Sequence, residues 1–138
     1  MNIGVKCIQC FMILMVVACQ AEIHKSETVV RHGVVYQIGH KKPFTGFVVG
    51  KGREDYRAQV CRYKKRYKDG LLHGTSKYWY SNGNLESEEP YENGEINGTV
   101  NRYHDNGKMK ARIPMENGMR GGGPGELFWD RRGNLKKG

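Results

Sequence analysis

Large aliphatic side chains are scarce in most of this sequence. After residue 18, leucine, isoleucine, valine and phenylalanine make up only 20 of 120 residues, and basic side chains outnumber acidic ones. That combination is typical of disordered chains, which bury too little apolar surface to offset the entropy lost on folding. Eight tyrosines and two tryptophans argue against disorder, because such side chains suit half-buried sheets. We therefore expect a thin sheet with a modest core.

Long apolar runs are also lacking, apart from one at the N-terminus. Lys6 supplies a single positive charge, and residues 7–17 are almost wholly apolar. This run is too short to span a bilayer comfortably as a helix, but it has the length of a signal-peptide hydrophobic region. We interpret residues 1–18 as a cleaved N-terminal signal helix. The alternative is a buried N-terminal helix, although nothing downstream offers an amphipathic helix to pack against it.

The residues that close the apolar run resemble a lipobox, since Val16-Val17-Ala18 precedes Cys19. By that resemblance, a diacylglyceryl group joins the Cys19 sulfur and cleavage frees its amine for acylation. Two or more acyl chains hold a protein stably at a membrane. Gln20 follows the cysteine, which favours the outer membrane if the source has two. The expected divisions are a lipoprotein signal peptide at 1–18, a linker at 19–33 and a folded repeat domain at 34–138.

Cysteine offers no internal cross-link under this interpretation. Cys7 and Cys10 form a C-x-x-C pair inside the export segment and would leave with it. With Cys19 lipidated, Cys61 is the one cysteine that remains, so no internal disulfide is expected. A small side chain in a strand is the preferred interpretation of Cys61, rather than a catalytic thiol.

A 24-residue repeat organises the rest of the chain. Residues 67–90 align with residues 91–114 without a gap, at seven identical positions, where chance would give roughly one or two. A third unit starts at Met115, and an earlier degenerate unit includes residues 43–47. Asn-Gly and Asp-Gly pairs tolerate the positive φ angles of tight hairpin turns. Such pairs occur at Asp69-Gly70, Asn82-Gly83, Asn93-Gly94, Asn106-Gly107 and Asn117-Gly118.

Residues between the turns alternate as a half-buried strand does. In residues 108–116 every second residue is apolar, which predicts one buried face and one wet face. In the preceding copy, Glu86 and Glu88 are expected on the wet face, while Ser87 and Glu89 make the dry face weaker. The apolar set of the later copy is Met109, Ala111, Ile113 and Met115, and its wet set is Lys108, Lys110 and Arg112.

The units that start at Tyr67 and Tyr91 contain Tyr-x-Asp-Gly-x-x-x-Gly and Tyr-x-Asn-Gly-x-x-x-Gly, each followed by aromatic-x-x-Asn-Gly. These motifs resemble MORN-repeat variants, and the nearest labelled group is the bacterial YwqK-type antitoxin family. The similarity covers about residues 34–138 and is clear from Tyr67 to Asn117. It implies an all-β fold, a single-layer antiparallel meander of β-hairpins that binds proteins or surfaces. It also implies an antitoxin role, although an exported lipoprotein would not meet a cytosolic toxin.

Catalytic and metal-binding motifs are lacking in the sequence. The five histidines form neither H-E-x-x-H nor a ligand pair with cysteine. Glu86, Glu88 and Glu89 lie on a strand expected to be solvated, with no histidine or serine at a meaningful spacing. Residues 121–125 are glycine-rich, but no Lys-Ser or Lys-Thr follows, so an enlarged turn is expected there. No enzymatic activity, cofactor or metal site is predicted.

Two sets of residues are candidates for binding. The basic segment 62–68 would suggest nucleic acid in a cytosolic protein, but export favours an anionic lipid or envelope polymer instead. Its alternative interpretation is a charged strand that discourages edge-to-edge aggregation. The aromatic set is a candidate recognition patch, although one alternating part of it must form the core. The cations are Arg62, Lys64, Lys65, Arg66 and Lys68, and the aromatics are Tyr78, Trp79, Tyr80, Tyr103 and Trp129.

These features together predict a lipid-anchored module of the cell envelope that binds a protein partner. The alternative function is electrostatic attachment to an anionic lipid or envelope polymer, and nucleic acid is not expected as a partner. The formal net charge of +9 is compatible with both. Ionic strength separates them, because attachment to a charged surface fades with salt whereas a mainly apolar interface does not.

Overall fold

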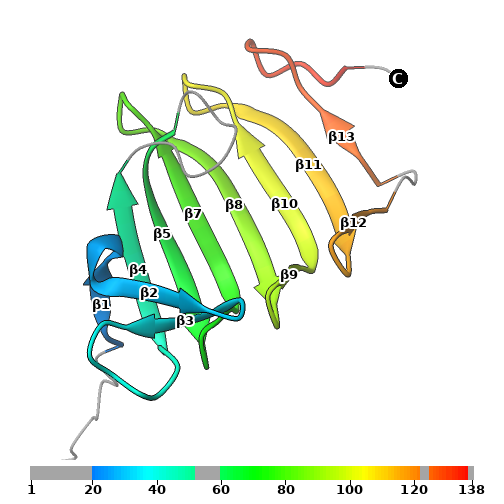
Figure 1. Ribbon diagram of the computed structural model, residues 1–138. Helices are drawn as coiled ribbons and strands as arrows, with labels where there is room; N and C mark the ends of the chain where they lie inside the picture. The colour runs from blue at the N-terminus through cyan, green and yellow to red at the C-terminus, as the bar shows by residue number, and fades with distance from the viewer. Residues whose placement is uncertain (1–19, 52–59, 122–124, 137–138) are drawn as a thin grey trace, which may run out of the picture.

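The computed structural model describes residues 20–51, 60–121 and 125–136. In these residues the chain forms thirteen strands and one short 3-10 helix (Figure 1). The elements are β1 Glu22–His24, η1 Lys25–Glu27, β2 Thr28–Arg31, β3 Val34–Gln37, β4 Gly46–Lys51, β5 Val60–Lys68, β6 Leu71–Leu72, β7 Gly74–Tyr80, β8 Leu85–Glu92, β9 Glu95–Ile96, β10 Gly98–Tyr103, β11 Met109–Glu116, β12 Met119–Arg120 and β13 Leu127–Phe128.

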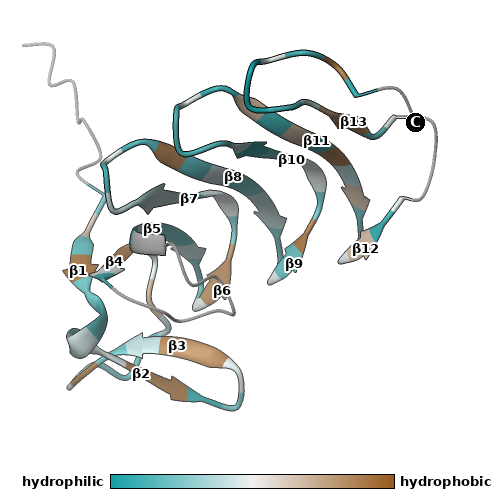
Figure 2. Cartoon of the chain, turned by 90° about the horizontal axis from the view of Figure 1, so that it is seen from above, coloured by the Kyte–Doolittle hydropathy of each residue, from teal (hydrophilic) through white to brown (hydrophobic). Residues whose placement is uncertain are grey.

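Eleven of these strands form one sheet, in the order β1-β4-β5-β7-β8-β10-β11-β12. The short strands β6, β9 and β13 pair with β5, β8 and β11. From β4 onward, every pairing between neighbours is antiparallel. Figures 1 and 2 show the successive hairpins side by side with their long strands bowed. The predicted all-β antiparallel meander is therefore confirmed.

The segment before residue 34 differs from the expected linker. Residues 22–24 form β1, which lies parallel to β4 at the first edge of the main sheet. Residues 28–37 form the β2–β3 hairpin, a separate two-stranded sheet, which lies off one face of the main sheet in Figure 2. Val35 ties the hairpin to the main sheet, because its N–H donates to the Gly70 carbonyl at 2.9 Å. Ordered structure therefore begins well inside the predicted 19–33 linker.

Turns at one end of the sheet have the geometry that the sequence predicted. Asn93 and Gly94 have φ angles of 50° and 92°, and a type I′ turn requires positive φ at both of its central residues. The same pattern recurs 24 residues earlier and later. It holds at Asp69-Gly70 and Asn117-Gly118, and also at His32-Gly33 in the separate hairpin.

Turns at the opposite end are of another kind. Here the glycine is left-handed, with φ of 83° at Gly107, while Asn106 is not. The Gly107 N–H donates to the His104 carbonyl at 2.9 Å, and the His104 N–H donates to the Lys108 carbonyl at 2.8 Å. This is a three-residue hairpin loop closed by a glycine bulge. The prediction of positive φ at Asn-Gly therefore holds for the glycine alone at this end.

The buried side chains form three small clusters on one side of the main sheet, which we call the inward face. Cross-strand pairing places Tyr63, Tyr78 and Ser87 on this face, and the opposite face is called the outward face. The predicted thin core is confirmed, since no cluster exceeds four buried residues. The clusters are Ile23, Val35, Phe44 and Val48; Tyr63 and Tyr78; and Val100, Ala111 and Ile113.

Bulges in β8 and β11 interrupt the predicted alternation of faces. Tyr78 pairs with Ser87 and Trp79 with Leu85, so Glu86 is an extra residue on its strand. Glu86 is only 8% exposed, so its predicted place on the wet face is wrong. The equivalent bulge in the next repeat falls at Lys110 and leaves Met109 paired with Tyr103. Ala111 and Ile113 are buried as expected, with Met115 packed against them.

Close packing in the first half of the sheet depends on Gly50. A Cβ atom at this position would lie 2.1 Å from the Tyr63 hydroxyl oxygen and 2.3 Å from its Cζ atom. We expect Gly50→Ala to lower the free energy of unfolding by about 1–3 kcal/mol, because the overpacked ring must shift. Urea unfolding measures this, with the exposed position Thr75→Ala as the control. An unchanged free energy for Gly50→Ala would contradict the packing of Tyr63 against this strand.

Candidate functional site

The outward face of β5 carries four of the five predicted basic residues. Alternate residues of a strand share one face, which places Arg62, Lys64, Arg66 and Lys68 together. Across the β5–β7 ladder, Arg62 pairs with Trp79. The sheet therefore builds a surface on β4, β5 and β7 that combines cations with aromatic rings.

Lys65 is separated from the other cations by the strand's alternation. It pairs with Val48, a buried residue of the inward face. Its ammonium nitrogen lies 4.8 Å from the centre of the Tyr63 ring and 5.8 Å from that of Tyr78. Such cation–π contacts orient the ammonium group on the inward side. The predicted five-cation surface is therefore corrected to a set of four.

Aromatic rings hold the outward cations in place. The Arg62 guanidinium lies 4.8 Å from the Trp79 ring centre, and the Lys64 ammonium lies 4.4 Å from the Phe47 ring centre. Lys64 also forms an ion pair with Glu22 of β1. A guanidinium seated on an indole keeps its edge N–H donors available for an anion. The outward face thus presents ordered positive charge.

The aromatic set divides between the two faces. Tyr78 and Tyr80 are only 3% and 7% exposed, so these two belong to the core and not to a recognition patch. Trp79, Tyr103 and Trp129 are each half-buried. Sequence reasoning recognised that one alternating subset must be core, and cross-strand pairing decides which subset it is.

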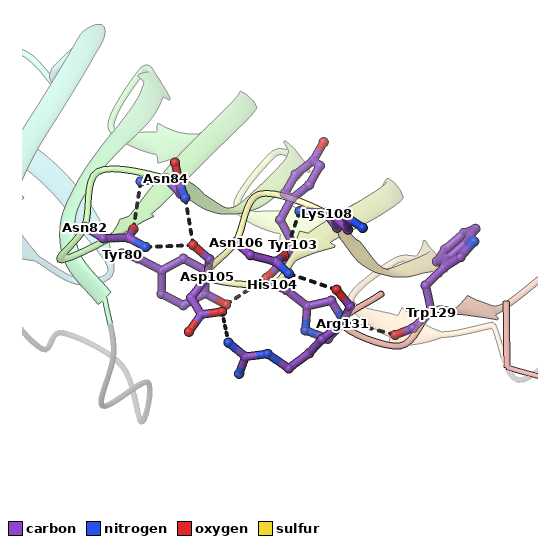
Figure 3. Close-up of polar contacts among 10 residues, drawn as sticks. All are labelled: Tyr80, Asn82, Asn84, Tyr103, His104, Asp105, Asn106, Lys108, Trp129 and Arg131. Atoms are coloured by element: carbon purple, nitrogen blue, oxygen red, sulfur yellow. Dashed lines mark hydrogen bonds and ion pairs between the residues drawn. The ribbon is translucent and has the colours of Figure 1, made fainter. Parts of the chain in front are cut away.

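The three half-buried aromatics occupy the same place in successive repeats. The Tyr103 hydroxyl donates to Glu88 at 3.1 Å, and Glu88 forms an ion pair with Lys77. Lys77 lies on the outward face, two residues before Trp79 on the same strand. Figure 3 shows the rings of Tyr103 and Trp129 on the same side of their strands. Because each repeat adds two strands, the ring-bearing positions are roughly 9–10 Å apart. We call Trp79, Tyr103 and Trp129 the aromatic row.

Side chains of the bulged turns connect one repeat to the next, as Figure 3 shows. The Asn82 amide donates to the Asp105 carbonyl at 2.7 Å, and the Asn106 amide donates to the Arg131 carbonyl at 2.8 Å. The Tyr80 hydroxyl likewise donates to the Tyr103 carbonyl at 2.7 Å. These bonds fix the spacing of the aromatic row at its turn end.

Sequence reasoning missed this role of the asparagines. It explained them by φ alone, whereas Asn82 and Asn106 act through their side chains. The available signal was the recurrence of Asn before Gly at a 24-residue spacing. In the last turn, the Asp130 carboxylate accepts hydrogen bonds from the backbone and side-chain amides of Asn134, and these bonds lower the Asp130 pKa.

The tyrosines of this region are held in their neutral form. Burial raises the pKa of Tyr80, with further contributions from the charges of Glu86 and Asp105. Burial also raises the pKa of Tyr103, and its hydrogen bond to Glu88 acts in the same direction. Both hydroxyls therefore stay protonated near neutral pH and keep donating to the Tyr103 carbonyl and to Glu88.

The carboxylates of β8 are not all solvated, contrary to expectation. Glu89 is only 2% exposed, on the inward face. Its carboxylate accepts hydrogen bonds from the Tyr91 hydroxyl at 3.0 Å and the Ser87 hydroxyl at 3.4 Å. Buried carboxylates need such donors to offset the loss of solvation. These contacts give Glu89 a structural role on the inward face.

Several predicted features lie outside the described residues, and a few others can be checked within them. The signal peptide and Cys19 are outside them, as is most of the glycine-rich stretch 121–125. Cys61 lies in β5, as expected for a strand residue. Within the described ranges, no three His, Cys, Asp or Glu side chains are grouped to hold a metal ion. The same ranges contain no helix long and apolar enough to cross a membrane.

Comparison with known proteins identifies the repeats. Residues 72–93 and 96–117 each match the MORN repeat variant. No curated protein and no solved structure matches the chain. The two MORN-variant segments begin at the short strands β6 and β9 and end in the type I′ turns that follow β8 and β11. MORN-variant repeats indicate a repeat-based binding module.

The two kinds of turn should respond differently to one substitution. Asn106→Asp removes the amide donor to the Arg131 carbonyl and should lower the free energy of unfolding by about 1 kcal/mol. Asn93→Asp should change it by less than about 0.5 kcal/mol, because Asp69 already occupies the equivalent type I′ position. Urea unfolding compares the two variants. Equal effects would mean that the hydrogen bond from the Asn106 amide to the Arg131 carbonyl adds no stability.

Proposed function

We propose that this protein is a lipid-anchored module of the cell envelope that binds a protein partner on its outward face. The observation that carries the proposal is the aromatic row, with Arg62 seated on its first member, Trp79. Tryptophan, tyrosine and arginine supply a large share of binding energy at protein interfaces. Repeat proteins commonly bind through extended surfaces of this kind.

Support for the anchor comes from the sequence. The apolar segment 7–17 and the lipobox-like residues before Cys19 favour export followed by acylation. Glu22, three residues after Cys19, already belongs to β1. An acylated Cys19 would therefore hold the sheet close to the membrane surface. The antitoxin role implied by the resemblance to the YwqK-type family would require a toxin on the same side of the membrane as the module.

A substitution test addresses the protein partner. Trp129→Ala and Tyr103→Ala should each weaken capture of the partner from envelope extracts at least about tenfold, because central aromatic residues dominate interface energies. Tyr36→Ala is the matched control, since Tyr36 lies on the separate β2–β3 hairpin and outside the row. Cross-linking followed by mass spectrometry identifies the captured protein. Capture that survives both row substitutions would exclude the aromatic row as the interface.

The alternative function rests on Arg62, Lys64, Arg66 and Lys68 lying on one face of β5. Each basic residue near an anionic membrane contributes about 1 kcal/mol of attraction. Attachment of this kind should weaken steeply between low and physiological salt, because the Debye length shortens. If capture depends on these four cations and on salt, but not on the aromatic row, the anionic lipid or polymer is the ligand.

Anchoring is tested separately at the cysteine. Cys19→Ser should abolish labelling with radioactive palmitate and leave the signal peptide uncleaved, because the modified sulfur is required for processing. Globomycin should likewise cause the precursor to accumulate in the unsubstituted protein. Cys61→Ser is the matched control and should be labelled normally. Palmitate labelling that persists in Cys19→Ser would disprove the proposed anchor without affecting the test of the aromatic row.

A further inference from the structure

A cavity of about 320 Å³ opens at the first edge of the main sheet. It lies where β1 ends at His24 while β4 continues to Lys51. Residues of β1, β4, β5 and β7 line it. The hollow is therefore a product of the short parallel strand, which covers only part of the edge of β4.

Two residues of the inward face, Gly50 and Tyr63, are paired across β4 and β5 beside this cavity. Because Gly50 has no side chain, the Tyr63 ring can lie against β4 at this point. Both residues line the cavity. Tyr63 is only 2% exposed, so its position is fixed by the packing around it. This packing holds β4 and β5 together before any ligand arrives, so the lining residues that they carry are already in place, which limits the entropy lost on binding.

The charge of the lining favours an anion. Lys51, Arg62 and Lys64 line the cavity, and Glu22 is the carboxylate among its lining residues. Glu22 is already paired with Lys64. Arg62 is oriented by its contact with Trp79, and a guanidinium can bind a carboxylate or phosphate through two parallel N–H bonds.

The rest of the lining favours a hydroxylated ring. Trp79 and Val49 offer an apolar wall, while the Glu22 carboxylate and the His24 imidazole are polar groups on the opposite, β1 side. A sugar ring has both an apolar C–H face and hydroxyl groups that need hydrogen-bond partners. The volume is at the lower end of the range for ligand pockets, which suits one ring rather than a long polymer segment.

We infer that this cavity binds a pyranose ring that carries one carboxylate or phosphate group. Arg62 and Lys51 bind the anionic group, and Trp79 packs against the ring. The ligand is either a sugar acid, as at the end of an acidic polysaccharide, or a sugar phosphate. This site shares Trp79 and Arg62 with the outward face proposed above as the protein interface, whereas Lys51 and the residues of β1 lie outside the aromatic row.

Tryptophan fluorescence of the full chain in mild detergent tests the site. The chain has two tryptophans, so Trp129→Phe leaves Trp79 as the reporter. Glucuronic acid and glucose 6-phosphate are the probes for the two ligand sources, with glucose and inorganic phosphate as comparisons. We expect a saturable change in fluorescence with at least one acidic sugar. Glucose should bind at least about tenfold more weakly, because it lacks the anionic group that forms charge-assisted hydrogen bonds.

Matched charge variants distinguish the cavity from general electrostatic attraction. Arg62→Gln should weaken binding about tenfold through loss of the paired hydrogen bonds. Lys68→Gln removes the same charge from the same strand, outside the cavity, and should change the affinity less than about twofold. Thermal melting confirms that both variants are folded, and Arg62→Lys should give an intermediate affinity because it keeps only the charge.

Several results would overturn the inference. One is the absence of a saturable change with both acidic sugars, and another is equal binding of glucose. A third is equal binding of inorganic phosphate, which would show that the sugar ring contributes nothing to the affinity. Equal weakening by Arg62→Gln and Lys68→Gln would also overturn it, because the attraction would then be diffuse. None of these results affects capture of a protein by Tyr103 and Trp129, so the two proposals fail independently.

Discussion

A repeated hydrogen bond between successive turns holds this sheet in register. The turn glycine of one unit donates its N–H to a carbonyl of the unit before it, from Gly94 to Leu72 at 2.8 Å and from Gly118 to Ile96 at 2.9 Å. Asn82 and Asn106 make the corresponding links at the other end through their side chains. With only small apolar clusters available, these links at both ends define the distance between repeats.

That regular spacing has consequences for both faces of the sheet. On the inward face, small clusters such as Tyr63 with Tyr78 alternate with polar residues such as Glu89, which is satisfied by neighbouring hydroxyls. On the outward face, Trp79 and Tyr103 recur at the same position of successive repeats. A surface built by repetition therefore arises without a separate binding loop.

The departures from perfect repetition create the most distinctive local chemistry. The first edge of the sheet is closed by a short parallel strand instead of another repeat hairpin. That strand ends before β4 does, which leaves the cavity beside Arg62 and Trp79. At the bulge in β8, Glu86 is turned from the expected wet face and becomes buried. Both features result from local breaks in a regular pattern.

Sequence by itself determined the hairpin repeat, the positions of the turns and the thin core, because turn chemistry and alternation are local properties. It left open which aromatics were buried, and it grouped Lys65 with cations that face the other way. Only tertiary structure decided these points, since a bulge or a parallel edge strand changes which residues become neighbours. The buried Tyr78 and the outward Trp79 are adjacent in sequence, and only strand pairing assigns each of them to its face.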